Sequence, residues 1–138
     1  MPRTRLLSLL LLPALFLLAA FRQVPLVDPA PVAVPQKIAQ EKNGLDKVSQ
    51  AIKKALVQRQ WIVNVDEPGK IAATYAPRDF SVQIGITYDR KQVQIKYLTS
   101  SNLKYEEKNG VRYIHTNYPS WIQNLVTDIN GNLTLAGF

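Results

Sequence analysis

The chain has 138 residues, of which 46% are hydrophobic and 20% charged, a composition typical of one globular domain rather than of a disordered chain. Lys and Arg outnumber Asp and Glu by 17 to 10, which gives a formal net charge of +7. The chain has no Cys and one His, so a disulfide scaffold, a thiolate metal site, a Cys nucleophile and a His-rich metal centre are excluded. We expect no metal and no cofactor.

The first 22 residues have the pattern of an export signal. Arg3 and Arg5 form a basic start, and residues 6–21 are apolar except for one Ser and one Pro. This stretch is shorter than the roughly 20 residues of a spanning helix and close to a secretory apolar segment. We therefore expect residues 1–22 to be a signal peptide or an N-terminal membrane anchor. Without the first 20 residues the net charge falls to +5, which is too weak to indicate a polyanionic partner.

Residues 23–42 are rich in proline, with Val and Ala between the prolines. Proline at this density disfavours a helix and favours extended backbone. We expect a linker between the membrane and a folded α+β domain at residues 43–138.

The domain begins with a predicted helix at residues 44–59. Its apolar residues recur at helical spacing, so one face must be buried. They are Leu45, Val48, Ile52, Ala55 and Leu56. Asn43 is expected to cap this helix, and Asp46 suits the positive end of the helix dipole.

Four strands are predicted next, at residues 61–65, 70–76, 80–88 and 92–97. Apolar and polar residues alternate in the later runs, which is typical of antiparallel strands with one buried and one wet face. Turn residues separate the runs, including Pro68-Gly69 between the first two.

Residues 99–116 are polar and contain an Asn109-Gly110 turn signal, so either a short hairpin or an extended connection is possible. A second helix is predicted at residues 119–129. Pro119 suits its first position, and Asn130-Gly131 is expected to end it.

The order of elements predicts a two-layer α+β fold. A helix is followed by a four-stranded antiparallel meander sheet and a C-terminal helix. Both helices are expected to cover the one apolar face of the sheet.

Six residues near the end of the sheet and the second helix are the candidate ligand- or partner-binding residues. They are Tyr97, Asn102, Tyr105, His115, Tyr118 and Trp121. Aromatic residues on a sheet more often fill the core, so this cluster also suits a purely structural role. A wider set of aromatic residues is expected mainly in the core or half-buried on the sheet, namely Tyr75, Tyr88, Tyr97, Tyr105, Tyr113, Tyr118, Trp61 and Trp121. In the sharper interpretation this wider set forms an aromatic ligand face with Asn102 and Arg78 as polar contacts.

Several segments of the domain resemble a family of small, largely uncharacterised proteobacterial envelope lipoproteins. The matching segments are residues 51–52, 55–56, 59–61, 68–73, 95–97, 100–105, 114–115, 118, 121–122 and 124–125. The resemblance implies an exported envelope protein and no enzymatic role. A lipoprotein signal ends at a lipidated Cys, whereas Phe21 follows Ala19-Ala20 here, so lipidation is excluded.

These observations predict a non-catalytic binding or structural domain of the bacterial cell envelope, periplasmic and either anchored by the N-terminal segment or released. Its expected partner is an envelope protein or an envelope polymer. The alternative is an envelope hydrolase acting through His115, which needs a nucleophile such as Ser100 or Ser101 and an acid such as Asp128. A cytoplasmic nucleic-acid binder is disfavoured, because export argues against it.

Overall fold

The computed structural model describes residues 22–138, so the predicted signal or anchor segment lies, except for Arg22, outside the described residues. The elements are β1 (Gln23–Pro25), β2 (Val32–Ala33), α2 (Gln36–Ala39), α3 (Gly44–Gln58), β3 (Ile62–Glu67), β4 (Lys70–Tyr75), β5 (Ser81–Tyr88), β6 (Gln92–Ser101), β7 (Glu106–Lys108), β8 (Val111–His115) and α4 (Asn117–Ala136). Within residues 22–138, no helix is both long enough and apolar enough to cross a membrane.

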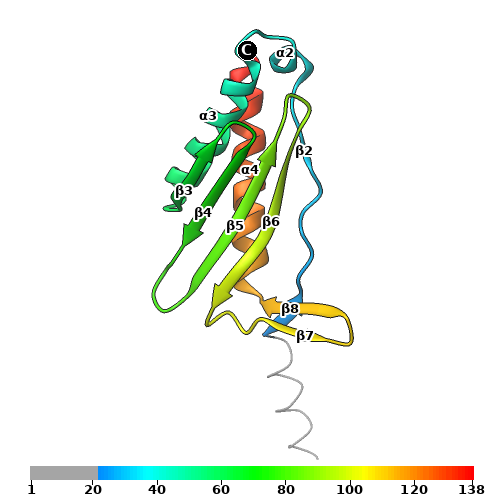
Figure 1. Cartoon of the computed structure of the whole chain (residues 1–138), viewed down its shortest axis with the longest axis vertical. Coiled ribbons are helices and arrows are strands. Elements are labelled where there is room, and N and C mark those ends of the chain that lie inside the picture. The colour runs from blue at the N-terminus through cyan, green and yellow to red at the C-terminus, as the bar shows by residue number, and fades with distance from the viewer. Residues whose placement is uncertain (1–21) are drawn as a thin grey trace, which may run out of the picture.

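A five-stranded antiparallel sheet forms one layer, in the order β2-β6-β5-β4-β3 (Figure 1). The expected meander of four strands is β3 to β6, and β2 adds a fifth strand beside β6. Alternation in β5 places four side chains in the core, which are Val82, Ile84, Ile86 and Tyr88. The predicted strand pattern is confirmed here, because a period of two separates the buried face from the wet face.

Helices α3 and α4 form the second layer on one face of that sheet, which confirms the α+β fold (Figure 1). Val48, Ile52 and Leu56 of α3 are fully buried. The two helices also contact one another, and Asn132 Nδ2 donates a hydrogen bond of 3.0 Å to the Ala51 carbonyl. Asn43 occupies the position before α3, but its side chain makes no capping hydrogen bond, so that expectation was wrong.

Helix α4 runs from Asn117 to Ala136, which corrects the predicted span of residues 119–129. The expected stop at Asn130-Gly131 is overridden, because Leu133 one turn later is fully buried in the core. Glycine inside a helix costs about 1 kcal/mol, less than the burial of a leucine contributes. Pro119 is the third helical residue, where the absent N–H breaks no intrahelical bond.

Residues 23–42 pack on the domain, which corrects the expectation of a linker. Strand β1 pairs with β8, and β2 pairs with β6. Four apolar side chains of the segment belong to the core, which are Leu26, Val32, Val34 and Ile38. The guanidinium of Arg90 donates to the carbonyls of Ala39 and Lys42 at 3.1 Å each, which holds the end of the segment. The prolines keep this segment extended, and the residues between them cover the domain.

Strands β7 and β8 form a hairpin, which decides between the two alternatives for residues 99–116. Asn109 and Gly110 have φ values of 52° and 77°, the left-handed pair that a two-residue hairpin turn requires. With β1 they form a three-stranded sheet at the end of the molecule where the described chain begins (Figure 1).

Candidate functional site

The six predicted site residues fall into two groups rather than one cluster. Tyr97, Tyr105 and Tyr118 lie together, and we call them the tyrosine cluster. Trp121 lies elsewhere, against Tyr75 and Phe80. His115 lies beside Phe80, and Asn102 bonds to a turn near the second group.

The tyrosine cluster holds the start of α4 against the sheet. The rings of Tyr97 and Tyr105 stack with centroids 5.0 Å apart and planes at 8°. The Tyr118 ring stands at 90° to that of Tyr97, with centroids 5.7 Å apart. The Tyr97 hydroxyl lies 2.7 Å from Ser100 Oγ, and the Tyr97 N–H donates to Asp28 Oδ1 at 3.0 Å.

Tyr118 is 3% exposed, and its buried hydroxyl has no hydrogen-bond partner among residues 22–138. Burial raises the pKa of this hydroxyl above its ordinary value, and the charge of Asp28 adds to the shift. A buried phenol that stays neutral at physiological pH suits packing rather than proton transfer. The tyrosine cluster is therefore a structural anchor of α4.

The second group is a row of four aromatic rings from four different parts of the chain. Trp61 and Tyr75 stack with centroids 5.2 Å apart, and Tyr75 meets Trp121 edge-on at 5.0 Å. Trp121 in turn lies 6.1 Å from Phe80. We call Trp61, Tyr75, Phe80 and Trp121 the aromatic groove. Trp61 is buried, but the other three rings are only half-buried, so aromatic surface remains open to solvent.

Two hollows lie along the aromatic groove and share Tyr75 and Trp121 as walls. The larger, of about 350 Å³, is lined by Tyr75, Pro77, Arg78, Phe80, Asn117 and Trp121. The smaller, of about 90 Å³, is lined by Arg59, Trp61, Tyr75, Trp121 and Asn124. The combination of aromatic walls and a few polar groups at the rim is typical of small-molecule sites.

The two arginines at the rim differ in their charge environment. Arg59 Nε donates to Asp128 Oδ2 at 2.7 Å, and Arg59 Nη2 donates to Oδ1 at 3.3 Å. This hydrogen bond lowers the pKa of Asp128 and raises the pKa of Arg59. Arg78 is exposed and makes no ion pair with any residue in the described part of the chain. The groove therefore carries one uncompensated positive charge.

Local backbone geometry builds the groove. After α3, Gln60 takes a left-handed φ of 66°, and the Trp61 N–H donates to the Leu56 carbonyl at 2.9 Å. This is a Schellman ending, which turns Trp61 back beneath the helix end. On the other side, Arg78 has a φ of 56° in the turn between β4 and β5.

Asn102 supports the groove from a distance. Its φ of 61° suits asparagine, and its Nδ2 donates to the Asp79 carbonyl at 2.9 Å. This bond fixes the turn that carries Arg78 and Phe80. Asn102 is thus a positioning residue for the groove.

His115 joins β8 to α4. Its ring Nδ1 accepts the backbone N–H of Asn117 at 3.0 Å, and the backbone N–H of His115 donates to the Leu103 carbonyl at 2.7 Å. Two of the residues that a hydrolytic triad could use are bonded to other groups: Ser100 to Tyr97, and Asp128 to Arg59. The structure does not assemble a triad at His115.

The six candidate site residues did not include Tyr75, Trp61 or Phe80; Tyr75 and Trp61 were named only within the wider set of aromatic residues, and Phe80 was not named as a site residue. The alternation of β4 carried a usable signal, because Ile71, Ala73 and Tyr75 share the inward face of the strand. The partners of Tyr75 come from α4 and from the end of α3, and no local pattern shows that they meet.

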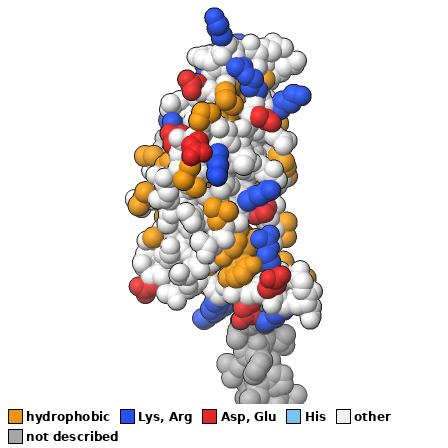
Figure 2. All heavy atoms as spheres, viewed as in Figure 1, with side chains coloured by type: hydrophobic (Ala, Val, Ile, Leu, Met, Phe, Trp, Pro, Cys, Tyr) orange, Lys and Arg blue, Asp and Glu red, His pale blue; other side chains and the backbone are white. Residues whose placement is uncertain are grey.

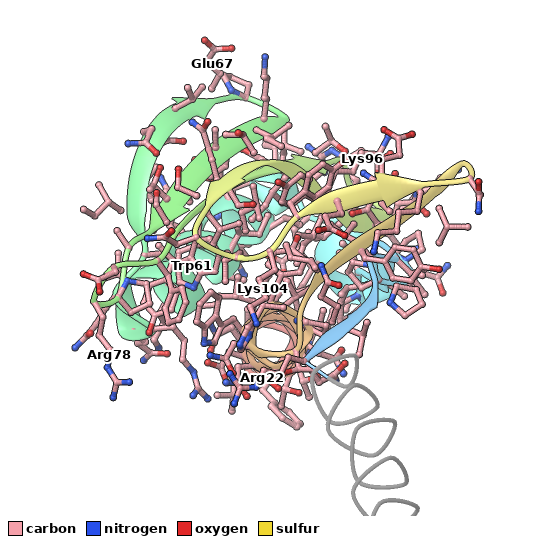
Figure 3. All side chains as sticks on the ribbon, turned by 90° about the horizontal axis from the view of Figure 1, so that it is seen from below. Arg22, Trp61, Glu67, Arg78, Lys96 and Lys104 are labelled. Carbon is pink, nitrogen blue, oxygen red and sulfur yellow. The ribbon has the colours of Figure 1, made fainter. Side chains whose placement is uncertain are left out.

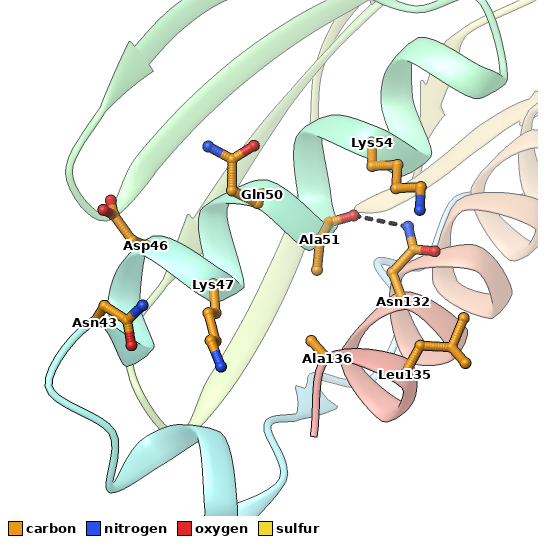
Figure 4. Close-up of a pocket in the computed structure, with 9 residues that line it drawn as sticks. All are labelled: Asn43, Asp46, Lys47, Gln50, Ala51, Lys54, Asn132, Leu135 and Ala136. Atoms are coloured by element: carbon orange, nitrogen blue, oxygen red, sulfur yellow. Dashed lines mark hydrogen bonds between the residues drawn. The ribbon is translucent and has the colours of Figure 1, made fainter. Parts of the chain in front are cut away.

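A wider hollow of about 580 Å³ lies between α3 and the end of α4 (Figure 4). It is lined by Asn43, Asp46, Lys47, Gln50, Ala51, Lys54, Asn132, Leu135 and Ala136. None of the predicted site residues and no aromatic ring line this hollow. The side-chain amide of Asn132 already donates to the Ala51 carbonyl between the two helices.

Among residues 22–138, no three His, Cys, Asp or Glu side chains are grouped so that they could hold a metal ion. No family model, no curated protein and no solved structure matches the chain.

Proposed function

We propose that the protein is a non-catalytic binding module of the bacterial cell envelope, exported by its N-terminal segment and either anchored by it or released. The proposal rests on the aromatic groove, which has three half-buried rings and the exposed Arg78, a residue that forms no ion pair in the described part of the chain. Aromatic rings that wall a hollow with a few polar groups at its rim are typical of a binding site. The basic start and the apolar residues 6–21 support export, and the resemblance to envelope lipoproteins belongs to the same proposal.

An anchored form has a defined orientation. Strand β1 begins at Gln23, directly after Arg22, and is paired with His115 of β8. No free spacer therefore separates an anchor at residues 1–22 from the domain, and the end with β1, β8 and β7 faces the membrane. Phe80 of the groove lies 5.9 Å from the His115 ring, so the groove opens near that end. Seen from below, Trp61 and Arg78 lie to the same side of α4 (Figure 3).

The alternative of an envelope hydrolase acting through His115 has less support, because Nδ1 already accepts the N–H of Asn117. A nucleic-acid binder has less support as well. In the view of Figure 2, basic and acidic side chains are interspersed instead of forming one basic patch.

Fractionation and site-specific crosslinking test the proposal. The full chain is expressed in a bacterium with the photo-crosslinker p-benzoylphenylalanine in place of Asn124 at the rim of the groove, or in place of exposed Thr87 in β5 as the control. We expect the protein in the envelope fraction, with a crosslinked species at position 124 that is absent at position 87. A cytoplasmic location, or identical crosslinks at both positions, would count against the proposal.

A further inference from the structure

Resting on the proposed function, we infer that the aromatic groove is a binding site for an acidic saccharide chain. The walls of the groove match the faces of a sugar ring. The non-polar C–H faces of a sugar ring pack flat on aromatic rings, whereas its hydroxyls need polar partners at the edge. The groove offers this combination, with rings from Tyr75, Phe80 and Trp121 and polar groups around them.

The rings are held in place before any ligand binds. Trp61 is 4% exposed and stacks on Tyr75 at an interplanar angle of 25°, so it supports Tyr75 from the core side. The ring planes of Tyr75 and Trp121 stand at 90° to one another, and both rings line each of the two hollows. A rigid aromatic surface binds with little loss of side-chain entropy.

The rim carries amide groups suited to sugar hydroxyls. Asn117 and Asn124 are exposed, and neither side chain makes a hydrogen bond to another residue within the described range. Each amide provides two donors and one acceptor oxygen, so it can pair with a hydroxyl that both donates and accepts. One amide borders each hollow, and they lie seven positions apart on α4.

The shape favours a chain rather than a single sugar. The two hollows, of about 350 and 90 Å³, both have Tyr75 and Trp121 among their lining residues, so they are neighbouring subsites along one groove. A ligand that fills both places successive rings on either side of this shared wall.

The charge favours an acidic ligand. Asp128 neutralises Arg59, whereas Arg78 makes no ion pair among residues 22–138. A guanidinium binds a carboxylate with two parallel hydrogen bonds, which supplies affinity and orientation together. Arg78 is therefore assigned to a carboxylate on the saccharide.

Two matched glycans test this inference by direct titration. Peptide-free peptidoglycan strands carry a lactyl carboxylate on every second sugar, whereas chito-oligosaccharides of equal length have the same N-acetylated backbone without it. The chain has two tryptophans, Trp61 and Trp121, and both line the smaller hollow, so intrinsic fluorescence reports occupancy of the groove. The full chain is kept soluble in a detergent without a sugar headgroup.

We expect a saturable fluorescence change with the acidic strands and weaker binding of the neutral ones. Arg78→Gln should raise the Kd for the acidic strands about tenfold and leave the neutral strands unchanged. Lys96→Gln removes the same charge from an exposed position of β6, outside the groove, and serves as the matched control. Trp121→Ala should abolish binding of both glycans, and Tyr105→Ala should preserve it, because Tyr105 belongs to the tyrosine cluster.

The outcomes separate this inference from the proposed function. Failure of both glycans to bind, together with a protein crosslinked at position 124, overturns the saccharide site and leaves the envelope binding module in place. Equal affinity for both glycans in the native protein overturns the assignment to acidic strands. Failure of both glycans together with no crosslink overturns both proposals.

Discussion

The carboxylate of Asp128 accepts two hydrogen bonds from the guanidinium of Arg59, at 2.7 and 3.3 Å, across 69 positions of the chain. The pair joins the residue after α3 to the middle of α4. It also sets the charge at one end of the aromatic groove, because Arg59 lines the smaller hollow. The same contact thus connects the packing of the helix layer with the electrostatics of the site.

This pair predicts a pH-dependent contribution to stability. The hydrogen bond from Arg59 lowers the pKa of Asp128 in the folded state below its ordinary value of 3.8. A lowered folded pKa contributes stability above the unfolded pKa, and that stability is lost as the pH falls through the folded value. Asp128→Asn should therefore be less stable than the native protein at pH 7, and the difference should shrink below about pH 4.

Urea denaturation midpoints at pH 7, 4 and 3 measure this difference. Asp79→Asn is the control, because the Asp79 side chain makes no ion pair with another described residue. Its difference from the native protein is measured at the same three pH values. A stability difference between the native protein and Asp128→Asn that is equally large at pH 7 and pH 3 would contradict a lowered pKa of Asp128 in the folded state.

The end of α3 predicts a stabilising substitution. Gln60 has a φ of 66°, a left-handed conformation that costs a residue with a Cβ about 1–2 kcal/mol. Gln60→Gly should stabilise the protein by about 0.5–1 kcal/mol after the added flexibility of the unfolded chain is subtracted. Gln58→Gly, two residues earlier and still helical, should instead destabilise by up to about 1 kcal/mol. Thermal or urea unfolding distinguishes the two, and a loss of stability in both variants would refute the left-handed strain.

Substitutions of two tyrosines of the tyrosine cluster are predicted to have opposite effects. Tyr118→Phe removes a buried hydroxyl that has no partner among residues 22–138, so stability at pH 7 should be unchanged or higher by about 1 kcal/mol. Tyr97→Phe removes a hydroxyl bonded to Ser100 at 2.7 Å and should cost about 1 kcal/mol.

Alkaline pH gives a second readout of Tyr118. Burial raises the pKa of its hydroxyl in the folded state, so the stability it contributes is complete below the unfolded pKa near 10 and is lost as pH rises above it. Tyr118→Phe should therefore lose less stability than the native protein between pH 9 and 11. Equal losses would indicate that the hydroxyl is open to water in solution and that its folded pKa is not raised.

Local patterns were sufficient for the elements whose signal lies in their own sequence. The alternation in β5 located Ile84 and Ile86 in the core, and helical spacing located Ile52 in α3. Local sequence patterns failed where a contact with a distant part of the chain overrides the local signal. Asn130-Gly131 has the residues of a helix end, yet the full burial of Leu133 continues α4 past it.

Only part of the candidate site was predicted, because contacts between distant segments of the chain bring the rest of it together. Trp121 and His115 were among the expected residues, and both lie in or beside the groove. Tyr97, Tyr105 and Tyr118 are close to them in sequence but form a separate cluster. The groove depends on Tyr75 and Trp61, whose meeting with α4 is decided by the order of the sheet and the length of α3.

The segment of residues 23–42 yields the last prediction, because a tether and a packed segment respond differently to truncation of an apolar side chain. Ile38 is fully buried, whereas Val27 in the same segment is 78% exposed. Ile38→Ala should lower the free energy of unfolding by about 2–5 kcal/mol, the usual cost of a cavity in a core. Val27→Ala should stay within about 0.5 kcal/mol of the native protein. Similar urea midpoints for the two variants would mean that the segment does not pack in solution, and an anchored groove would then be free to move away from the membrane.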